Sequence, residues 1–80
     1  YVGDAIQFDA TRGLMEIDVK NRFSIGDKLE CVHPSGNHVF TLTHMENKKG
    51  ETVTVAPGSG HRVWINLPAL YTESFVARFV

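Results

Sequence analysis

Hydrophobic and polar positions alternate along this chain with a period of two. The clearest stretch begins at Met15, where Met15, Ile17 and Val19 alternate with three charged residues. This alternation is typical of a strand that buries one face and exposes the other, as strands of antiparallel sheets do. The same pattern, interrupted by turn residues, predicts further strands over residues 1–9, 28–32, 38–46, 53–55 and 62–67.

Two segments in the middle of the chain depart from simple alternation. Met45 is out of phase with Phe40 and Leu42, so a single strand over residues 38–46 requires a β-bulge. Residues 21–27 contain turn-forming glycine, serine and aspartate, and this composition predicts a connection between strands.

The tail, residues 69–80, fits two local structures. Leu70 and Tyr71 suit a helical turn, whereas alternation reappears at Phe75, Ala77 and Phe79 and suits a closing strand. With the tail included, six or seven short strands separated by turns predict an all-β sandwich or barrel.

Composition supports a single all-β domain over residues 1–80. Val, Ile and Thr number 19 together, against 10 for Leu and Ala, which argues against a helical bundle. We predict a small closed or partly closed antiparallel β-barrel, because closure removes the exposed edges of a small sheet. Its core is expected to contain Met15, Ile17, Val19, Leu29, Phe40, Leu42, Val53, Val63 and Ile65.

Charge and cysteine content narrow the possible partners and the cellular location of the protein. The formal net charge of -1 lacks the broad positive field of non-specific nucleic-acid binders, so any RNA contact needs a local patch. The single Cys31 forms no internal disulfide, which favours a reducing, cytoplasmic location. No apolar run approaches the roughly 20 residues of a membrane span, so no membrane partner is expected. Alternation already runs at Tyr1, and we expect a C-terminal fragment of a longer chain.

Four pieces of the sequence resemble one known family. They are Tyr1-Val2-Gly3, Val19-Lys20-Asn21-Arg22-Phe23-Ser24-Ile25-Gly26-Asp27-Lys28-Leu29-Glu30, Val55-Ala56-Pro57-Gly58 and Trp64-Ile65-Asn66-Leu67-Pro68. Together they resemble the C-terminal domain of the collagenase-like peptidase U32 family over nearly the whole chain. Within that family the chain is most similar to the bacterial branch associated with tRNA hydroxylation at the wobble uridine.

The resemblance implies a small β-barrel appended to an N-terminal catalytic domain built as a (β/α)-barrel. The catalytic and cofactor residues of the family then lie outside this chain, and the reaction of the parent stays open between peptidase and tRNA hydroxylation. The piece from Phe23 to Leu29 also resembles the second, β-barrel domain of translation elongation factors, at the level of fold alone.

The residues themselves carry no pattern typical of a catalytic, metal or cofactor site. The four histidines (His33, His38, His44 and His61) lack the spacings of zinc ligands. Cys31 shares the buried phase of Leu29 and has no base beside it, and no serine lies in a Gly-x-Ser-x-Gly elbow. We therefore expect no catalytic residue, metal or cofactor in this domain and no enzyme activity of its own.

A scattered basic and aromatic set is the best candidate for a partner surface: Lys20, Arg22, His61, Arg62 and Trp64. Arginine and tryptophan neutralise phosphates and stack on bases, so the set suits RNA contact. A tryptophan on the outer face of its strand equally suits an anchor for a neighbouring domain.

The function predicted from the sequence is a non-catalytic accessory module. It would position a macromolecular substrate, tRNA or protein, for the N-terminal catalytic domain of the same chain. The alternative is a purely structural lid, interdomain or dimerisation module.

Overall fold

The computed structural model describes residues 1–79 and consists almost wholly of short antiparallel strands. In chain order the elements are β1 (Gly3–Asp9), β2 (Leu14–Val19), β3 (Phe23–Ser24), β4 (Lys28–Val32), β5 (His38–Thr41), β6 (Met45–Glu46), β7 (Val55–Ala56), β8 (Arg62–Ile65), the 3₁₀ turn η1 (Ala69–Tyr71) and β9 (Phe75–Arg78). Seven strands form one sheet in the order β5-β4-β9-β1-β2-β8-β6, and β3 pairs with β7. The all-β prediction is confirmed.

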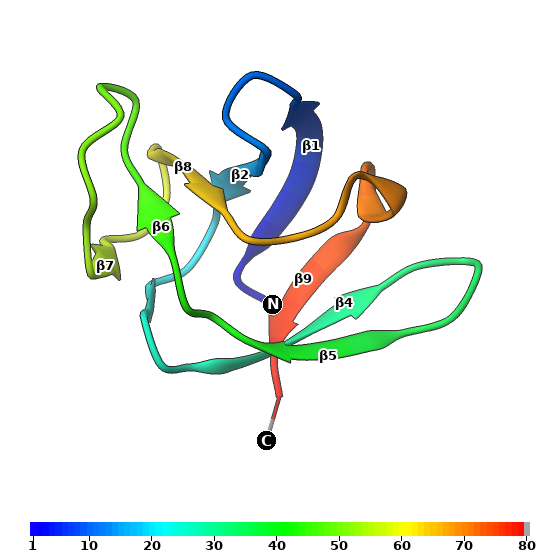
Figure 1. Cartoon of the computed structure of the whole chain (residues 1–80). Coiled ribbons are helices and arrows are strands. Elements are labelled where there is room, and N and C mark those ends of the chain that lie inside the picture. Colours follow the sequence, from blue (N-terminus) through cyan, green and yellow to red (C-terminus); the bar gives the residue numbers. More distant parts are fainter. Residues whose placement is uncertain (80) are drawn as a thin grey trace.

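The seven-stranded sheet curves around the core as a partly closed barrel (Figure 1). Its two edge strands, β5 and β6, are consecutive in sequence, and residues 42–44 cross from one edge to the other. The side-chain oxygen of Asn66 accepts hydrogen bonds from the amides of Thr43 and His44, each at 3.2 Å, and so holds this crossing against the end of β8. A chain crossing, and not a continuous ladder, therefore bridges the open side of the barrel between β5 and β6.

The predicted single strand over residues 38–46 is wrong. The chain leaves β5 at Leu42, whose amide donates to the carbonyl of Asp27 and whose carbonyl accepts from the amide of Gly26, both at 2.9 Å. Leu42 is fully buried. The out-of-phase Met45 consequently begins a new strand at the opposite edge of the sheet, and no bulge is needed there.

A β-bulge occurs instead in β1, next to a close approach of two strands. The pairing of β1 with β2 passes from Ala5 opposite Ile17 to Gln7 opposite Glu16, so β1 has one extra residue at this point. Nearer the start of β1, a Cβ atom added at Gly3 would lie 2.7 Å from the carbonyl oxygen of Asp18. Glycine is required there because the two backbones leave no room for a side chain.

The core is one cluster, as predicted. Seven of the nine predicted residues are buried, and the other two, Phe40 and Val53, are partly buried and pack against the cluster. The connection 21–27 contributes Phe23, which is fully buried, because this segment forms β3 and pairs with β7. The prediction of a single barrel core is confirmed.

The tail forms both predicted local structures in succession, the turn η1 and then the closing strand β9. Val76 takes the inner position of β9, since it lies opposite Cys31 in β4 and is fully buried. Phe75, at 60 % exposure, and Phe79, at 42 %, lie on the outer face. Val80, the last residue of the predicted tail, lies outside the described residues. Over residues 1–79, no helix has the length and apolar character needed to cross a membrane.

Candidate partner surface

Three of the five predicted surface residues lie together where β2 ends and β8 begins. Arg62 pairs with Asp18 in the ladder between these strands, and the amide of Val19 donates to the carbonyl of His61 at 3.0 Å. Lys20 follows Val19 directly, and the side chains of Lys20, His61 and Arg62 are all exposed. The antiparallel pairing of β2 with β8 therefore gathers residues that are about forty positions apart in the sequence.

Arg22 and the first residues of the chain lie at the same end of the sheet. The amides of Lys20 and Asn21 both donate to the carbonyl of Val2, at 2.8 and 3.2 Å. The guanidinium of Arg78 donates to the carbonyl of Arg22 at 2.9 Å, so Arg22 is fixed through its backbone. Its own side chain is exposed and makes no hydrogen bond or ion pair within residues 1–79.

Carboxylates balance much of the positive charge at this end. The guanidinium of Arg62 lies 2.9 Å from Glu16, and the amine of Lys20 lies 3.1 Å from Asp18. The hydrogen bond to Glu16 raises the pKa of the Arg62 guanidinium. A third carboxylate, Asp4, lies directly opposite Asp18 in the ladder of β1 and β2. Arg22 is consequently the cation of this group that is least compensated.

Trp64 lies two residues further along β8 than Arg62, on the same face of the sheet, and it neighbours Glu16, the carboxylate that Arg62 contacts. It is opposite Glu16 in β2 and Glu46 in β6, on the outer face of the sheet. Its ring is partly buried because the guanidinium of Arg12 lies 4.4 Å from the ring centroid. A cation at this distance attracts the π-face of the ring, so the chain itself covers part of the tryptophan.

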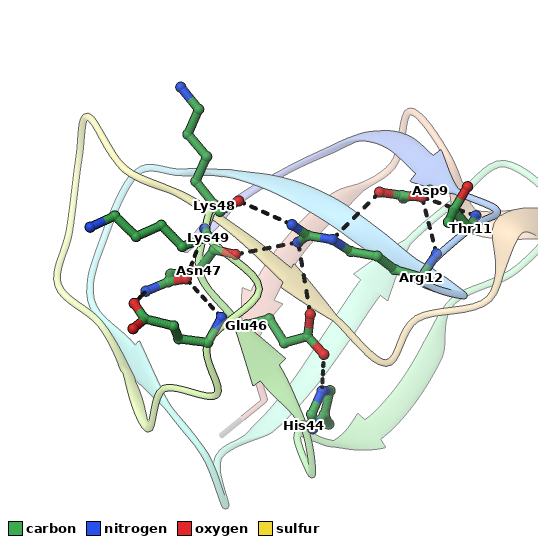
Figure 2. Close-up of polar contacts among 9 residues, drawn as sticks. Asp9, Thr11, Arg12, His44, Glu46, Asn47, Lys48 and Lys49 are labelled. Atoms are coloured by element: carbon green, nitrogen blue, oxygen red, sulfur yellow. Dashed lines mark hydrogen bonds and ion pairs between the residues drawn. The ribbon is translucent and has the colours of Figure 1, made fainter.

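No sequence signal pointed to Arg12, although its side chain joins the turn between β1 and β2 to the turn that follows β6. It lies in the turn between β1 and β2, and Figure 2 shows its guanidinium directed at the turn that follows β6. It donates to the carbonyls of Asn47 at 3.3 Å and Lys48 at 3.0 Å, with the carboxylates of Asp9 and Glu46 at 3.7 and 3.8 Å. Backbone carbonyls 35 and 36 residues away leave no trace in the local sequence.

The histidines contact aromatic rings and polar groups of the chain itself. The rings of His33 and His38 flank the turn between β4 and β5 and both contact Tyr71, with centroid distances of 5.6 and 4.8 Å. His44 is hydrogen-bonded to Glu46 at 2.7 Å. Over residues 1–79, no three side chains of His, Cys, Asp or Glu come together in a way that suits a metal ion.

Cys31 is a core residue, as its phase predicted. It is fully buried, and its sulfur lies 2.7 Å from the hydroxyl of the buried Ser74. Burial raises the pKa of the Cys31 thiol, and the hydrogen bond with Ser74 acts in the opposite direction. A buried, protonated thiol is a poor nucleophile, so this geometry gives Cys31 a packing role.

Comparison with known proteins identifies relatives over almost the whole chain. Residues 1–78 match the family model described as the peptidase family U32 C-terminal domain. The chain is 54 % identical over 55 residues to tRNA hydroxylation protein P of Escherichia coli K12, a match that covers 69 % of this chain and 12 % of that protein. It is 41 % identical over 68 residues to tRNA hydroxylation protein P of Haemophilus influenzae, covering 85 % of this chain and 15 % of that protein. The chain thus spans a small part of both relatives.

A solved structure shares the fold. The C-terminal domain of a U32-family protein from Geobacillus thermoleovorans superimposes with a TM-score of 0.87 at 17 % identity, covering 100 % of this chain and 92 % of the other. Its selenomethionine variant gives a TM-score of 0.85 at 18 % identity, with 98 % of both chains covered.

Proposed function

This chain belongs to the peptidase U32 family as its C-terminal domain, and from that premise we propose that it is a non-catalytic accessory β-barrel that positions RNA for a catalytic domain preceding it. One observation carries the proposal: Lys20, Arg22, His61 and Arg62 gather at the end of the sheet where the chain begins. RNA held there would lie beside a domain joined at Tyr1.

The names of the two relatives support RNA as the substrate class, since both are tRNA hydroxylation proteins. Single-stranded loops of RNA are bound through phosphate neutralisation and stacking, and exposed Arg, Lys and His side chains supply the first of these. The unpaired Cys31 favours the reducing cytoplasm, where such RNA is present. Neither a cofactor nor a metal is assigned to this domain.

The charge balance sets the expected affinity. Lys20 and Arg62 already contact carboxylates, so a phosphate would have to compete with Asp18 and Glu16. Arg22 carries no such partner within the described residues and should contribute most. We expect the domain alone to bind tRNA in the non-specific range of roughly 0.1 mM to 1 µM, with affinity falling as salt rises.

The test is a titration of labelled tRNA at two salt concentrations. The variant Lys20→Ala/Arg22→Ala removes two positive charges from the proposed surface, and the matched control Lys48→Ala/Lys49→Ala removes two from the turn after β6. The proposal predicts several-fold weaker binding and a shallower salt dependence, by about one to two released ions, for the first variant only. Equal losses in both variants, or no binding by the wild type, would contradict it.

A structural role is the second candidate function, and the near balance of charge on the outer face of β1, β2 and β8 favours it. Three carboxylates (Asp4, Glu16 and Asp18) lie among the cations there, an arrangement that suits a protein surface more readily than a polyanion. Under this alternative, Trp64 and its neighbours would contact another domain, and the tRNA titration would show no binding.

A further inference from the structure

The outer face of the sheet changes character halfway across. One row of laterally paired residues spans five strands, namely Val32, Phe75, Asp4, Asp18 and Arg62 on β4, β9, β1, β2 and β8. Laterally paired residues in a sheet point to the same side. The β1–β2–β8 half of this row is charged, whereas the β4–β9 half is apolar.

We call the apolar half the β4–β9 face. Its large exposed side chains are Tyr1, Val32, Val39, Phe75 and Phe79. Tyr1 is 55 % exposed and Phe75 is 60 % exposed, and their rings meet edge to face with centroids 6.1 Å apart. Val32 pairs with Phe75 across β4 and β9, so Tyr1, Phe75 and Val32 are neighbours, and Val39 and Phe79 lie further along the same face.

Polar groups lie among the apolar side chains of the β4–β9 face. Glu30 lies between Val39 and Ala77 in a neighbouring row and accepts a hydrogen bond from Asn37 at 3.2 Å. The amine of Lys28 lies 5.4 Å from the ring centroid of Phe79. A mixed apolar and polar surface of this kind is typical of contacts between domains of one chain, which are more polar than a protein core.

We propose that the β4–β9 face is the docking surface for the polypeptide that precedes Tyr1 in the full-length protein. The relatives support a large preceding part, since this chain matches only 12 % and 15 % of their lengths. Tyr1 is itself part of the face, so a polypeptide that joins there lies next to Phe75 and needs no long linker to cover it. This proposal rests on the family assignment and not on RNA binding.

The location of the two aromatic residues explains why docking is favourable. Outward Phe75 and Tyr1 keep apolar area in water, and a covering domain would remove that area, which favours association. Exposed apolar side chains that gather on one face of a protein mark an interaction site more often than singly scattered ones do. A second copy of this chain is the competing occupant.

The first test measures burial in the full-length protein. Single substitutions Phe75→Cys and Leu70→Cys are labelled with a maleimide, and modification is read peptide by peptide by mass spectrometry. Leu70 is the matched control because it is 63 % exposed but lies on η1, away from the β4–β9 face. Docking predicts labelling at least about tenfold slower at position 75 than at position 70, because labelling at 75 must wait for local opening. Equal rates would overturn the proposal.

The second test measures the attachment of the domain. In the full-length protein, Phe75→Gln/Phe79→Gln should accelerate proteolysis of the junction before Tyr1, whereas Leu70→Gln should leave it unchanged. Both phenylalanines are exposed in this domain, so the variant should fold, which a circular dichroism spectrum checks. A second copy of the chain would occupy the face if protection of position 75 from labelling disappears on dilution and a dimer forms at high concentration. That result would overturn the proposal. Failure of tRNA binding with intact protection would refute only the RNA-positioning role.

Discussion

Removal of the Arg12 side chain should destabilise the domain by about 2.5–4 kcal/mol. Its two hydrogen bonds to the carbonyls of Asn47 and Lys48 join turns that are distant in the sequence. The side chain is 25 % exposed, so each bond from the charged guanidinium is taken as about 1 kcal/mol, below the usual 1.5–3 kcal/mol. The contact with the Trp64 ring adds about 0.5–1 kcal/mol, and the two longer ion pairs at most about 1 kcal/mol together.

The measurement is urea unfolding followed by far-UV circular dichroism, with wild type, Arg12→Ala and Arg12→Lys compared. A lysine keeps the charge but lacks the planar fork that reaches two carbonyls at once, so Arg12→Lys should lose about half as much stability as Arg12→Ala. Lys48→Ala is the control, because the Lys48 side chain points away from Arg12 (Figure 2) and only its carbonyl takes part. That variant should stay within about 0.5 kcal/mol of wild type.

Two results would refute this reasoning. The first is a free energy of unfolding of Arg12→Ala within about 0.5 kcal/mol of the wild-type value. In that case the guanidinium contributes nothing measurable to stability, and the turn after β6 is held by its own hydrogen bonds. If Arg12→Lys is as stable as wild type, charge alone matters and the two carbonyl contacts contribute nothing. The fluorescence of Trp64, the single tryptophan, gives an independent local check, since its environment should change in Arg12→Ala.

Two further predictions concern the core. Ile17→Ala should cost about 2–5 kcal/mol in thermal or urea unfolding, because Ile17 is fully buried within the cluster; a loss below about 1 kcal/mol would contradict that placement. For Cys31, burial raises the pKa above the ordinary value of 9.0, so the folded state favours the protonated thiol. The free energy of unfolding should therefore keep its full value at pH values below the pKa of the unfolded thiol. It should decline as the pH rises through that pKa towards the raised pKa of the folded thiol. Cys31→Ala should lack this alkaline decline, and parallel stability curves for the two proteins would exclude the assignment.

Strands with strict alternation could be predicted because the alternation itself encodes which side is buried. Ile17 and Val63 show this, since they pair across β2 and β8 and both point into the core. The break between β5 and β6 could not be predicted. It depends on hydrogen bonds of Leu42 with residues 26 and 27, which are brought close only by the folded barrel.

The candidate surface was predictable in composition but not in arrangement. Lys20 and Arg62 come together only because β2 pairs with β8, and their carboxylate partners are set by the same register. The guanidinium over Trp64 comes from the turn between β1 and β2, and nothing in the sequence around position 12 or 64 indicates that contact. The outward phase of Phe75 was likewise undetermined, because alternation fixes two faces without saying which one the core takes.

The strand order also bears on how the domain is synthesised. β9, the last strand of the described chain, lies between β4 and β1 near the middle of the sheet. Until Phe75–Arg78 is available, the sheet exists only as two pieces, β5–β4 and β1–β2–β8–β6, each with an open edge where β9 belongs. A nascent chain that lacks residues 75–78 cannot complete this ladder, because both open edges pair with β9. The domain is therefore expected to fold only after β9 has left the ribosomal exit tunnel, and its two open edges need protection from other chains until then.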